Sequence, residues 1–321
     1  MFRSDLFKTI AILIMLISGM LSGNSAYAGW NPGGPIKLMI GFKAGGGADT
    51  QARLIAEELQ ARHGWKIIPS QVMGKGGINL ANAIKKSPND GTVIGMFVSE
   101  TFGYNLVVSK KTGLKLDDFT PLITTAEFEM GIVAKHSQGW KTFHDVIAAA
   151  KSGQQIRFGA MSQKLADLAY LLARNNGVEF NIVMTKGGKG VMNSLNAGDI
   201  DVGFVAGIQA RSVASGDMVN LASGLSRPLK QTPEAPVMKD LGVQFNADGY
   251  FLFAAPAGLP AQVRQELSKV IAEIVNDPSS KPGGFIQKAF GGASVLKGDE
   301  LDHFLERQYQ SAEQLLKAVT E

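Results

Sequence analysis

Hydrophobic positions along the chain fall into two alternating patterns. Short, continuous apolar runs such as residues 36–42 are typical of buried strands, whereas apolar residues three and four positions apart predict helices. One such helix is expected over residues 49–62, with Asp49 as its N-cap. The same patterns predict further strands over residues 65–69, 92–98, 130–134, 156–160, 182–185, 201–205 and 249–260, and further helices over residues 79–86, 142–151, 164–175, up to 195, over 261–276 and, capped by Asp299, over 300–319. Strands that alternate with helices predict an α/β fold with mainly parallel sheets.

This alternation restarts once along the chain. It runs to about residue 127, begins again near Phe128, and returns to an apolar segment, GYFLFAAPAGLP, at residues 249–260. We therefore expect two lobes with a hinge between them, the first formed by residues 29–127 plus 250–321 and the second by residues 128–249. The length supports this division, because single hydrophobic cores stop growing at about 250–300 residues.

The N-terminus has the pattern of a secretory signal peptide. Arg3 and Lys8 precede a mostly apolar run, and the small-x-small sequence AYA ends at Ala28. We expect cleavage after Ala28, so that residues 1–28 are the signal peptide and the mature protein is exported. A membrane anchor is the alternative, but the apolar run is well short of the ~20 residues that span a bilayer.

Composition and charge exclude several classes of protein. The chain has no cysteine, so it contains no disulfide and no lipid-modified N-terminal cysteine. Its formal net charge is +4, which is too small and too dispersed to indicate a nucleic-acid partner. The four histidines are scattered without metal-ligand spacing. We therefore expect no metal, no cofactor and no nucleic acid.

Three glycine-rich segments follow predicted strands and precede predicted helices: FKAGGGAD at residues 42–49, MGKGG at 73–77 and TKGGKG at 185–190. A glycine turn before a helix presents backbone N–H groups at the positive end of the helix dipole, which suits an anion. In an open α/β sheet such loops line the ligand crevice. The same loops contain four lysines: Lys43, Lys75, Lys186 and Lys189. Together they favour an anion-binding cleft, although the triple glycine alone fits a structural turn equally well.

No catalytic constellation is evident in the sequence. There is no cysteine nucleophile and no Gly-x-Ser-x-Gly motif, and the single Ser-x-x-Lys, at residues 294–297, lies in a predicted strand where its ends face opposite sides. Glu127 and Glu129 flank the expected crossing between lobes, and we interpret them as charges on the hinge surface. We expect a protein that is not an enzyme. The alternative is a secreted α/β hydrolase or isomerase that acts on a carboxylate.

Several short motifs, taken in order, resemble those of a known family: GPIKLMIGFKAGGGADTQARLIAEEL, SPNDGTVIGM, DDFTPL, TKGG and FLFAAPAGLP. The chain resembles the substrate-binding proteins of the tripartite tricarboxylate transporter family, the Bug-type periplasmic receptors, over residues 30–321. The resemblance implies a two-lobed, type II periplasmic-binding-protein-like fold that closes on a small carboxylate, a di- or tricarboxylate or an aromatic acid. It implies membrane components of such a transporter as partners, and we expect a monomer. A non-catalytic periplasmic protein of other function is the weaker alternative.

The resemblance also implies a set of ligand-binding residues. They are Phe42, Gly45, Gly46, Gly47 and Asp49 in the first loop, Gly76, Gly77 and Asn79 in the second, Ser99 and Thr101 after the third strand, and Met161, Ser162, Lys186, Gly187, Gly188 and Ala206 in the second lobe. Gly46 is expected in a backbone conformation reserved for glycine, and Lys186 is expected to supply positive charge.

The sequence departs from the family pattern at four of these places. In the second loop, the family's Gly-Gly-Asn is one residue longer here, with Ile78 between Gly77 and Asn79. Glu100 stands between the two hydroxyl residues after the third strand, residues 160–164 replace a serine-rich loop, and Val205 and Ala206 replace an Asp-Asn pair. These departures predict a pocket with fewer hydroxyls and more lysine and methionine, hence a different or more apolar carboxylate.

Overall fold

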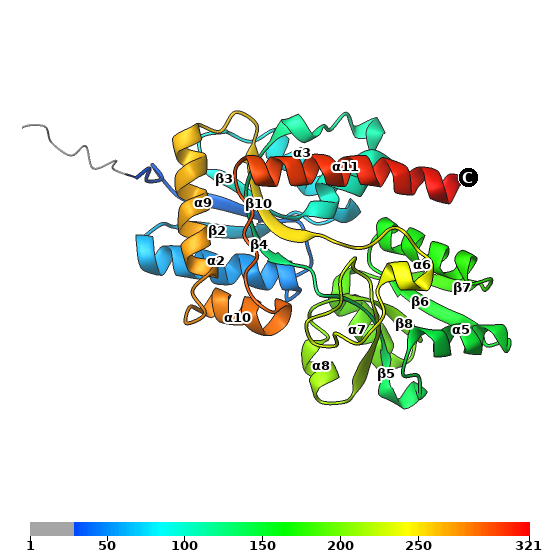
Figure 1. Cartoon of the computed structure of the whole chain (residues 1–321). Coiled ribbons are helices and arrows are strands. Elements are labelled where there is room, and N and C mark those ends of the chain that lie inside the picture. Colours follow the sequence, from blue (N-terminus) through cyan, green and yellow to red (C-terminus); the bar gives the residue numbers. More distant parts are fainter. Residues whose placement is uncertain (1–28) are drawn as a thin grey trace, which may run out of the picture. The chain divides into compact units, whose positions relative to one another are not determined.

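The computed structural model describes residues 29–321, so the predicted signal peptide lies outside the described residues. Residues 32–321 form one compact unit that contains two five-stranded sheets (Figure 1). Each sheet has its own helices, and we call each sheet with its helices a lobe. The prediction of two α/β lobes is confirmed.

The first lobe is built on a sheet with the strand order β2-β1-β3-β10-β4. Its strands are β1 (Ile36–Ile40), β2 (Ile67–Gln71), β3 (Val93–Val98), β4 (Phe119–Glu127) and β10 (Tyr250–Pro256). Its helices are α2 (Gly47–His63), α3 (Ile78–Lys85), the short α4 (Leu106–Val108), α9 (Ala261–Val275), α10 (Lys281–Phe290) and α11 (Asp299–Thr320). Strand β10 runs antiparallel between β3 and β4, and β1 pairs in parallel with β2 and β3. The sheet is therefore mixed, with four strands in one direction.

The second lobe repeats this plan with the strand order β7-β6-β8-β5-β9. Its strands are β5 (Met130–Lys135), β6 (Ile156–Ala160), β7 (Phe180–Met184), β8 (Val202–Ala206) and β9 (Met218–Ser223), and its helices are α5 (Phe143–Lys151), α6 (Gln163–Asn175), α7 (Gly187–Ala197) and α8 (Ala210–Ala214). Here β5 is the antiparallel strand, between β8 and β9. In both lobes the parallel strands end at one edge, which is where ligand crevices form in α/β sheets.

Four longer elements, β4, α8, β9 and α10, have no counterpart in the predicted pattern. Helix α10 contains Pro282, Gly283 and Gly284, which are poor helix formers. Its start is nevertheless capped, because the Ser280 side chain accepts a hydrogen bond from the Gly283 N–H and Pro282 lies in the first turn. The burial of Phe290 and its neighbours then holds the helix against the first lobe. Helix α10 is therefore stabilised by tertiary packing, against the low helix propensity of its first turn.

Two predicted helix caps are wrong. The N-caps are Gly46 for α2 and Gly298 for α11, whereas Asp49 and Asp299 lie inside the first turn of their helices. An acidic residue in the first turn is still favourable, because it faces the positive end of the helix dipole.

Two other segments also differ from the prediction. Most of TKGGKG is helical and not loop, because α7 already begins at Gly187. Residues 294–297 do not form a strand, and a single bridge between Lys297 and Ile123 links this segment to β4.

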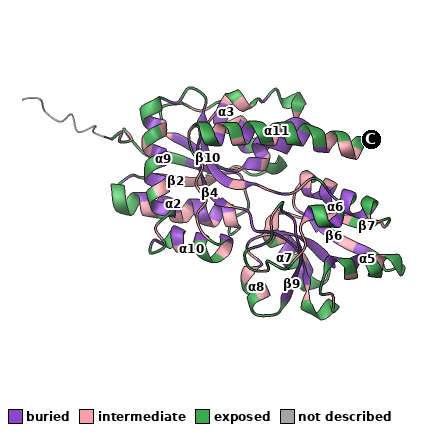
Figure 2. Ribbon diagram, viewed as in Figure 1, coloured by how far each residue is buried: buried purple, intermediate pink, exposed green. Residues whose placement is uncertain are grey.

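The central strands of both sheets are buried, the edge strands β2 and β7 are partly exposed, and the outer faces of the helices are exposed (Figure 2). In the first lobe, the ring of Phe102 packs between those of Phe97 and Phe119, with ring centroids 4.9 and 5.2 Å away. Phe102 belongs to the π-helical turn over Thr101–Asn105, directly after β3. This aromatic cluster therefore anchors the turn that carries several residues of the candidate site.

Candidate functional site

Turns from the two lobes meet where the parallel strands end. A Cβ placed on Gly45, after β1, would lie 3.3 Å from Nζ of Lys189 in the other lobe. The Tyr104 hydroxyl, in the turn after β3, donates a hydrogen bond to the Asp167 carboxylate of α6. Two glycine-rich segments and the turn after β3 therefore share one region between the lobes, which is the candidate site.

The first loop is held by the buried carboxylate of Asp49. Its oxygens accept hydrogen bonds from the Gly45 N–H at 2.9 Å, from Nε of Arg53 at 2.9 Å and from Nε2 of Gln71 at 2.5 Å. The Gly46 N–H donates to the Lys43 carbonyl at 3.2 Å. Asp49 and the amides of Gly45 and Gly46 are thus engaged within the first lobe, and Asp49 acts by positioning the loop.

Only one residue of the triple glycine needs to be glycine for conformational reasons. Gly45 has a φ of 74°, which L-residues rarely adopt, whereas Gly46 has a φ of −80°. The prediction that Gly46 occupies a glycine-only conformation is therefore wrong. Gly47 has a different constraint, since a Cβ there would lie 3.0 Å from the Phe290 ring. Phe42, which precedes the glycines, is half-buried.

The second loop is clamped to the turn after β3. The Gly76 carbonyl accepts hydrogen bonds from the Thr101 hydroxyl and the Asn105 amide, both at 2.9 Å. Gly76 and Gly77 have φ values of 62° and 96°, and a Cβ on Gly77 would lie 2.5 Å from Oγ1 of Thr101. The structure thus brings Gly76, Gly77 and Thr101 into direct contact.

Two other predicted site residues bond to nearby backbone. Oγ of Ser99, which is fully buried, accepts a hydrogen bond from the Tyr250 N–H at 3.0 Å. The Asn79 amide donates to the Met73 carbonyl at 2.9 Å. Ser99 therefore ties β3 to β10, and Asn79 shapes the second loop.

In the second lobe, Ser162 is the N-cap of α6 and accepts a hydrogen bond from the Leu165 N–H. A Cβ on Gly188 would lie 3.8 Å from the sulfur of Met161, so these two predicted residues are neighbours. Lys186 is the exposed N-cap of α7, and Gly187, with a φ of 73°, follows it. Ala206 ends β8 and is half-buried.

Two residues of opposite charge are absent from the predicted site, Glu100 in the first lobe and Lys164 in the second, and each affects the pKa of the other. Glu100 lies two residues after the end of β3, and the Asn105 amide lies 3.5 Å from its carboxylate. Burial raises the pKa of Glu100, against the opposing effects of Lys164 and of a hydrogen bond with Ser162. Burial also lowers the pKa of Lys164, while Glu100 and Asp248 counteract that shift. The sequence signal was present, since both residues lie where the chain departs from the family pattern.

The Tyr104–Asp167 hydrogen bond is a second link between the lobes. Tyr104 is fully buried, and burial together with Asp167 raises the pKa of its hydroxyl. The other Asp167 oxygen accepts from Nε2 of Gln163 at 2.8 Å. Asp167 is thus satisfied by protein groups.

Replacing Tyr104 with phenylalanine should loosen the contact between lobes. A hydrogen bond to a charged group contributes about 1.5–3 kcal/mol, so the variant should populate separated lobes roughly ten- to a hundredfold more. Small-angle scattering of ligand-free protein measures the radius of gyration, which we expect to increase. Tyr170→Phe, on an exposed face of α6, is the matched control. Unchanged scattering in Tyr104→Phe would contradict a linking role.

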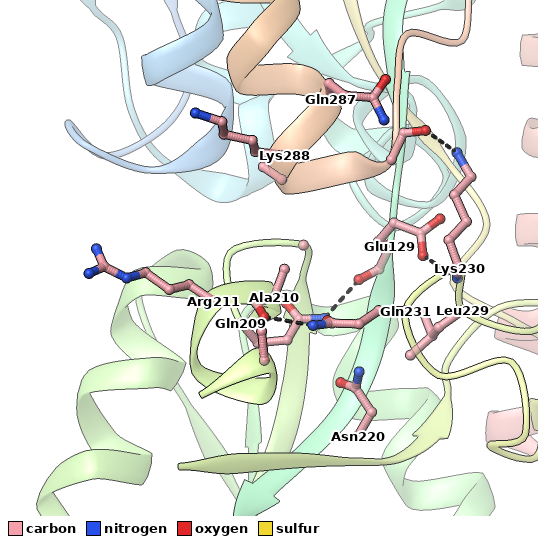
Figure 3. A pocket seen from close by; sticks show the side chains of 14 residues that line it. Glu129, Gln209, Ala210, Arg211, Asn220, Leu229, Lys230, Gln231, Gln287 and Lys288 are labelled. Carbon is pink, nitrogen blue, oxygen red and sulfur yellow. Dashed lines mark hydrogen bonds between the residues drawn. The ribbon is translucent and has the colours of Figure 1, made fainter. Parts of the chain in front are cut away.

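A pocket of about 440 Å³ lies beside this site, between α8 and the end of α10 (Figure 3). Its lining includes Glu129, Gln209, Arg211, Asn220, Lys230, Gln287 and Lys288. Nζ of Lys230 is bound to the Gly291 carbonyl at 3.1 Å, and Glu129 accepts a hydrogen bond from the Lys230 N–H at 3.0 Å. None of the predicted ligand-binding residues lines this pocket. We therefore place the site at the strand ends, where the glycine-rich segments of both lobes converge.

Glu127 and Glu129 are not the surface charges expected. Nη2 of Arg227 lies 2.8 Å from a carboxylate oxygen of each, and Glu129 is buried. The three residues form an ion-paired cluster on both sides of Phe128, where the chain passes from β4 to β5.

Two features are absent from residues 29–321. No helix there is long and apolar enough to cross a membrane. The same residues contain no group of three or more His, Asp or Glu side chains placed to hold a metal ion.

Comparison with known proteins finds one matching family model and several relatives in sequence. The family model described as tripartite tricarboxylate transporter family receptor matches residues 51–300. A protein of Agrobacterium vitis, from the TAR-I ttuE-ttuC' intergenic region, is 25% identical over 253 residues, which cover 77% of this chain and 73% of that protein. Protein BugT of Bordetella pertussis is 26% identical over 251 residues, covering 75% of this chain and 76% of BugT.

Solved structures share the fold. The periplasmic binding protein BugD superposes with a TM-score of 0.78 at 21% identity, covering 90% of this chain and 99% of BugD. MatC of Rhodopseudomonas palustris, with bound malate, has a TM-score of 0.75 at 18% identity, covering 89% of this chain and 99% of MatC. An R. palustris protein with adipate has a TM-score of 0.78 at 20% identity, covering 90% and 98%. The predicted type II periplasmic-binding-protein fold is thereby confirmed.

Proposed function

The chain belongs to the family of tripartite tricarboxylate transporter receptors, and from this premise we propose that it captures a small carboxylate for such a transporter. The observation that carries the proposal is the meeting of Gly45 and Lys189, which brings glycine-rich segments of both lobes to one place. Two relatives with this fold hold dicarboxylates, malate and adipate.

The chemistry of the site supports an anionic ligand. Lys186 and Lys189 lie at the start of α7, where backbone N–H groups and the positive end of the helix dipole attract a carboxylate. In this proposal Gly187 and Gly188 bind through their backbone. Asp49 and Thr101 position the loops of the first lobe and do not touch the ligand.

We also propose the location and division of the protein. The family consists of receptors of a transporter, which supports a periplasmic mature protein. Cleavage of the signal peptide after Ala28 is proposed from the sequence pattern alone. Residues 29–127 plus 250–321 would form the first lobe and residues 128–249 the second, with the Arg227 cluster at the hinge. The protein would act as a monomer beside the membrane components of the transporter.

A receptor is favoured over a secreted hydrolase or isomerase. The acidic pair that such an enzyme could use as acid and base, Glu127 and Glu129, is ion-paired with Arg227, whose Nη2 lies 2.8 Å from an oxygen of each carboxylate. Mass spectrometry of the denatured, freshly purified protein tests this choice, because a receptor releases its acid chemically unchanged.

Small acids should raise the melting temperature of the mature protein. A ligand present at a hundredfold excess over its dissociation constant stabilises the native state by about 2.7 kcal/mol, which corresponds to roughly 5–10 °C. The measurement is a thermal-shift screen of di- and tricarboxylates, aromatic acids and amino acids, with neutral sugars as controls. A shift with sugars and none with any acid would refute the proposal.

A further inference from the structure

We propose that the pocket between α8 and α10 is a second binding site, which takes a small anion on a hydroxylated chain, such as a sugar acid or a polyol phosphate. This inference goes beyond the proposed function and does not depend on it, because the pocket lining and the residues proposed to bind the captured carboxylate have no member in common. The cavity of about 440 Å³ lies within the range of about 300–1,000 Å³ that is usual for small-molecule sites.

Two buried amide side chains line this pocket (Figure 3). Gln209, shortly after β8, is 2% exposed, and Asn220 of β9 is 5% exposed. A Cβ on Gly131, in the intervening strand β5, would lie 2.5 Å from Oδ1 of Asn220 and 3.1 Å from Nε2 of Gln209. The absence of a side chain at Gly131 therefore leaves the space in which the two amides lie close together over β5.

Each of these amides uses its donor within the protein. Nε2 of Gln209 donates a hydrogen bond to the Glu129 carbonyl at 3.0 Å, and Nδ2 of Asn220 donates to the Thr232 hydroxyl at 3.1 Å. Within residues 29–321, Oε1 of Gln209 and Oδ1 of Asn220 have no hydrogen-bond partner. A buried acceptor without a partner is destabilising, so both oxygens favour a molecule that supplies O–H or N–H donors.

The charged side chains of the lining are mostly positive. They are three cations and one carboxylate: Arg211, Lys230, Lys288 and Glu129. Both oxygens of the carboxylate already accept hydrogen bonds, from Arg227 at 2.8 Å and from the Lys230 N–H at 3.0 Å. The cations therefore attract an anion and repel an ammonium group, which leaves hydroxyls as the donors for the two amide oxygens.

The Phe290 ring separates this pocket from the candidate site. A Cβ on Gly207, in the pocket lining, would lie 2.6 Å from the ring, and a Cβ on Gly47, in the first glycine-rich loop, would lie 3.0 Å from it. The buried ring thus lies between the two glycines. Because α10 belongs to the first lobe and Gly207 to the second, a molecule in the pocket would contact both lobes.

The experiment titrates the purified protein calorimetrically with pairs of probes that differ only in their hydroxyl groups. Glycerol 3-phosphate is compared with propyl phosphate, and D-gluconate with hexanoate, so that the two pairs also distinguish a phosphate from a carboxylate. We expect the hydroxylated member of at least one pair to bind roughly tenfold more tightly than its counterpart. The neutral polyols glycerol and sorbitol should bind more weakly than the corresponding anions, because they lack the charge that the cations attract.

Two variants and a control locate the binding. Arg211→Gln, at an exposed position, should weaken binding of the anion about tenfold, whereas Arg307→Gln, on α11, should leave the affinity unchanged. Gln209→Met keeps the length of the side chain but removes its acceptor, so it should abolish the preference for hydroxyls. Circular dichroism establishes that each variant is folded, and Arg211→Gln tests the site on its own if Gln209→Met does not fold.

Three results would overturn the inference. Binding of no probe would show that water alone fills the pocket. Equal affinity for both members of each pair, or a hydroxyl preference that survives in Gln209→Met, would remove the role of the amides. Weaker binding in Lys186→Gln but not in Arg211→Gln would place the anion at the candidate site, which would leave the proposed receptor intact.

Discussion

Replacing Gly77 with alanine should destabilise the protein by about 3 kcal/mol. The φ of 96° costs an L-residue roughly 1–2 kcal/mol, and a Cβ 2.5 Å from Oγ1 of Thr101 adds an overpacking cost of about 1–3 kcal/mol. Thr101 cannot yield freely, because its hydroxyl is bonded to the Gly76 carbonyl. Urea denaturation measures the loss in the free energy of unfolding.

Gly113→Ala provides the control for this substitution. Gly113 has a φ of 68° but no atom within 4 Å of the Cβ position, so it bears the conformational cost without the steric one. We expect a loss of about 1–2 kcal/mol there. Equal losses in the free energy of unfolding in Gly77→Ala and Gly113→Ala would contradict this estimate, because they would show that the contact of a Cβ at residue 77 with Thr101 carries no steric cost.

Asp49→Ala should destabilise the protein by about 2–3 kcal/mol and weaken ligand binding as well. Three donors, the Gly45 N–H, Arg53 and Gln71, lose their acceptor together, and a hydrogen bond to a charged group contributes about 1.5–3 kcal/mol. We estimate a loss close to that of a single hydrogen bond, although three donors lose their acceptor. The reason is that Arg53 and Gly45 are accessible to water, which can accept hydrogen bonds in place of the carboxylate. Urea denaturation and calorimetric titration measure the two effects.

Asp117→Ala is the matched control for Asp49→Ala, since Asp117 is exposed and surface changes alter the free energy of unfolding by about 0.5 kcal/mol or less. Asp49→Asn should give an intermediate result, because an amide oxygen still accepts from the Gly45 N–H but carries no charge for Arg53. Full stability with reduced affinity would instead place Asp49 in contact with the ligand.

The elements that the sequence predicts well are those with local signals. Helix α5 has a threonine cap and a clear apolar stripe, and it begins at Phe143, within one residue of the expectation. Strand β4 and helix α10 give no such signal, because each contains proline and α10 contains two glycines as well. Only their burial against the rest of the first lobe makes them regular.

The candidate site likewise contains features that the sequence predicts and features that it does not predict. The glycine-rich segments are visible in composition, and Gly45, Gly76 and Gly77 do adopt conformations that favour glycine. The partners of Glu100 are not visible, because they depend on which loops of the second lobe face β3. The sequence also gives no sign that the Thr101 hydroxyl donates a hydrogen bond to the Gly76 carbonyl of its own lobe, because that contact depends on how the second loop folds against the turn after β3.

The C-terminal helix offers an attachment point for a fluorescent reporter of the contact between the lobes. Helix α11 has 22 residues, about 33 Å at 1.5 Å per residue, and begins on the sheet of the first lobe (Figure 1). Near its other end, the Ala318 carbonyl accepts a hydrogen bond from Arg174 of α6, in the second lobe. A fluorophore attached at residue 321 would therefore move with one lobe while it lies against the other. Since the native chain has no cysteine, a single engineered thiol would direct such a dye to that position alone.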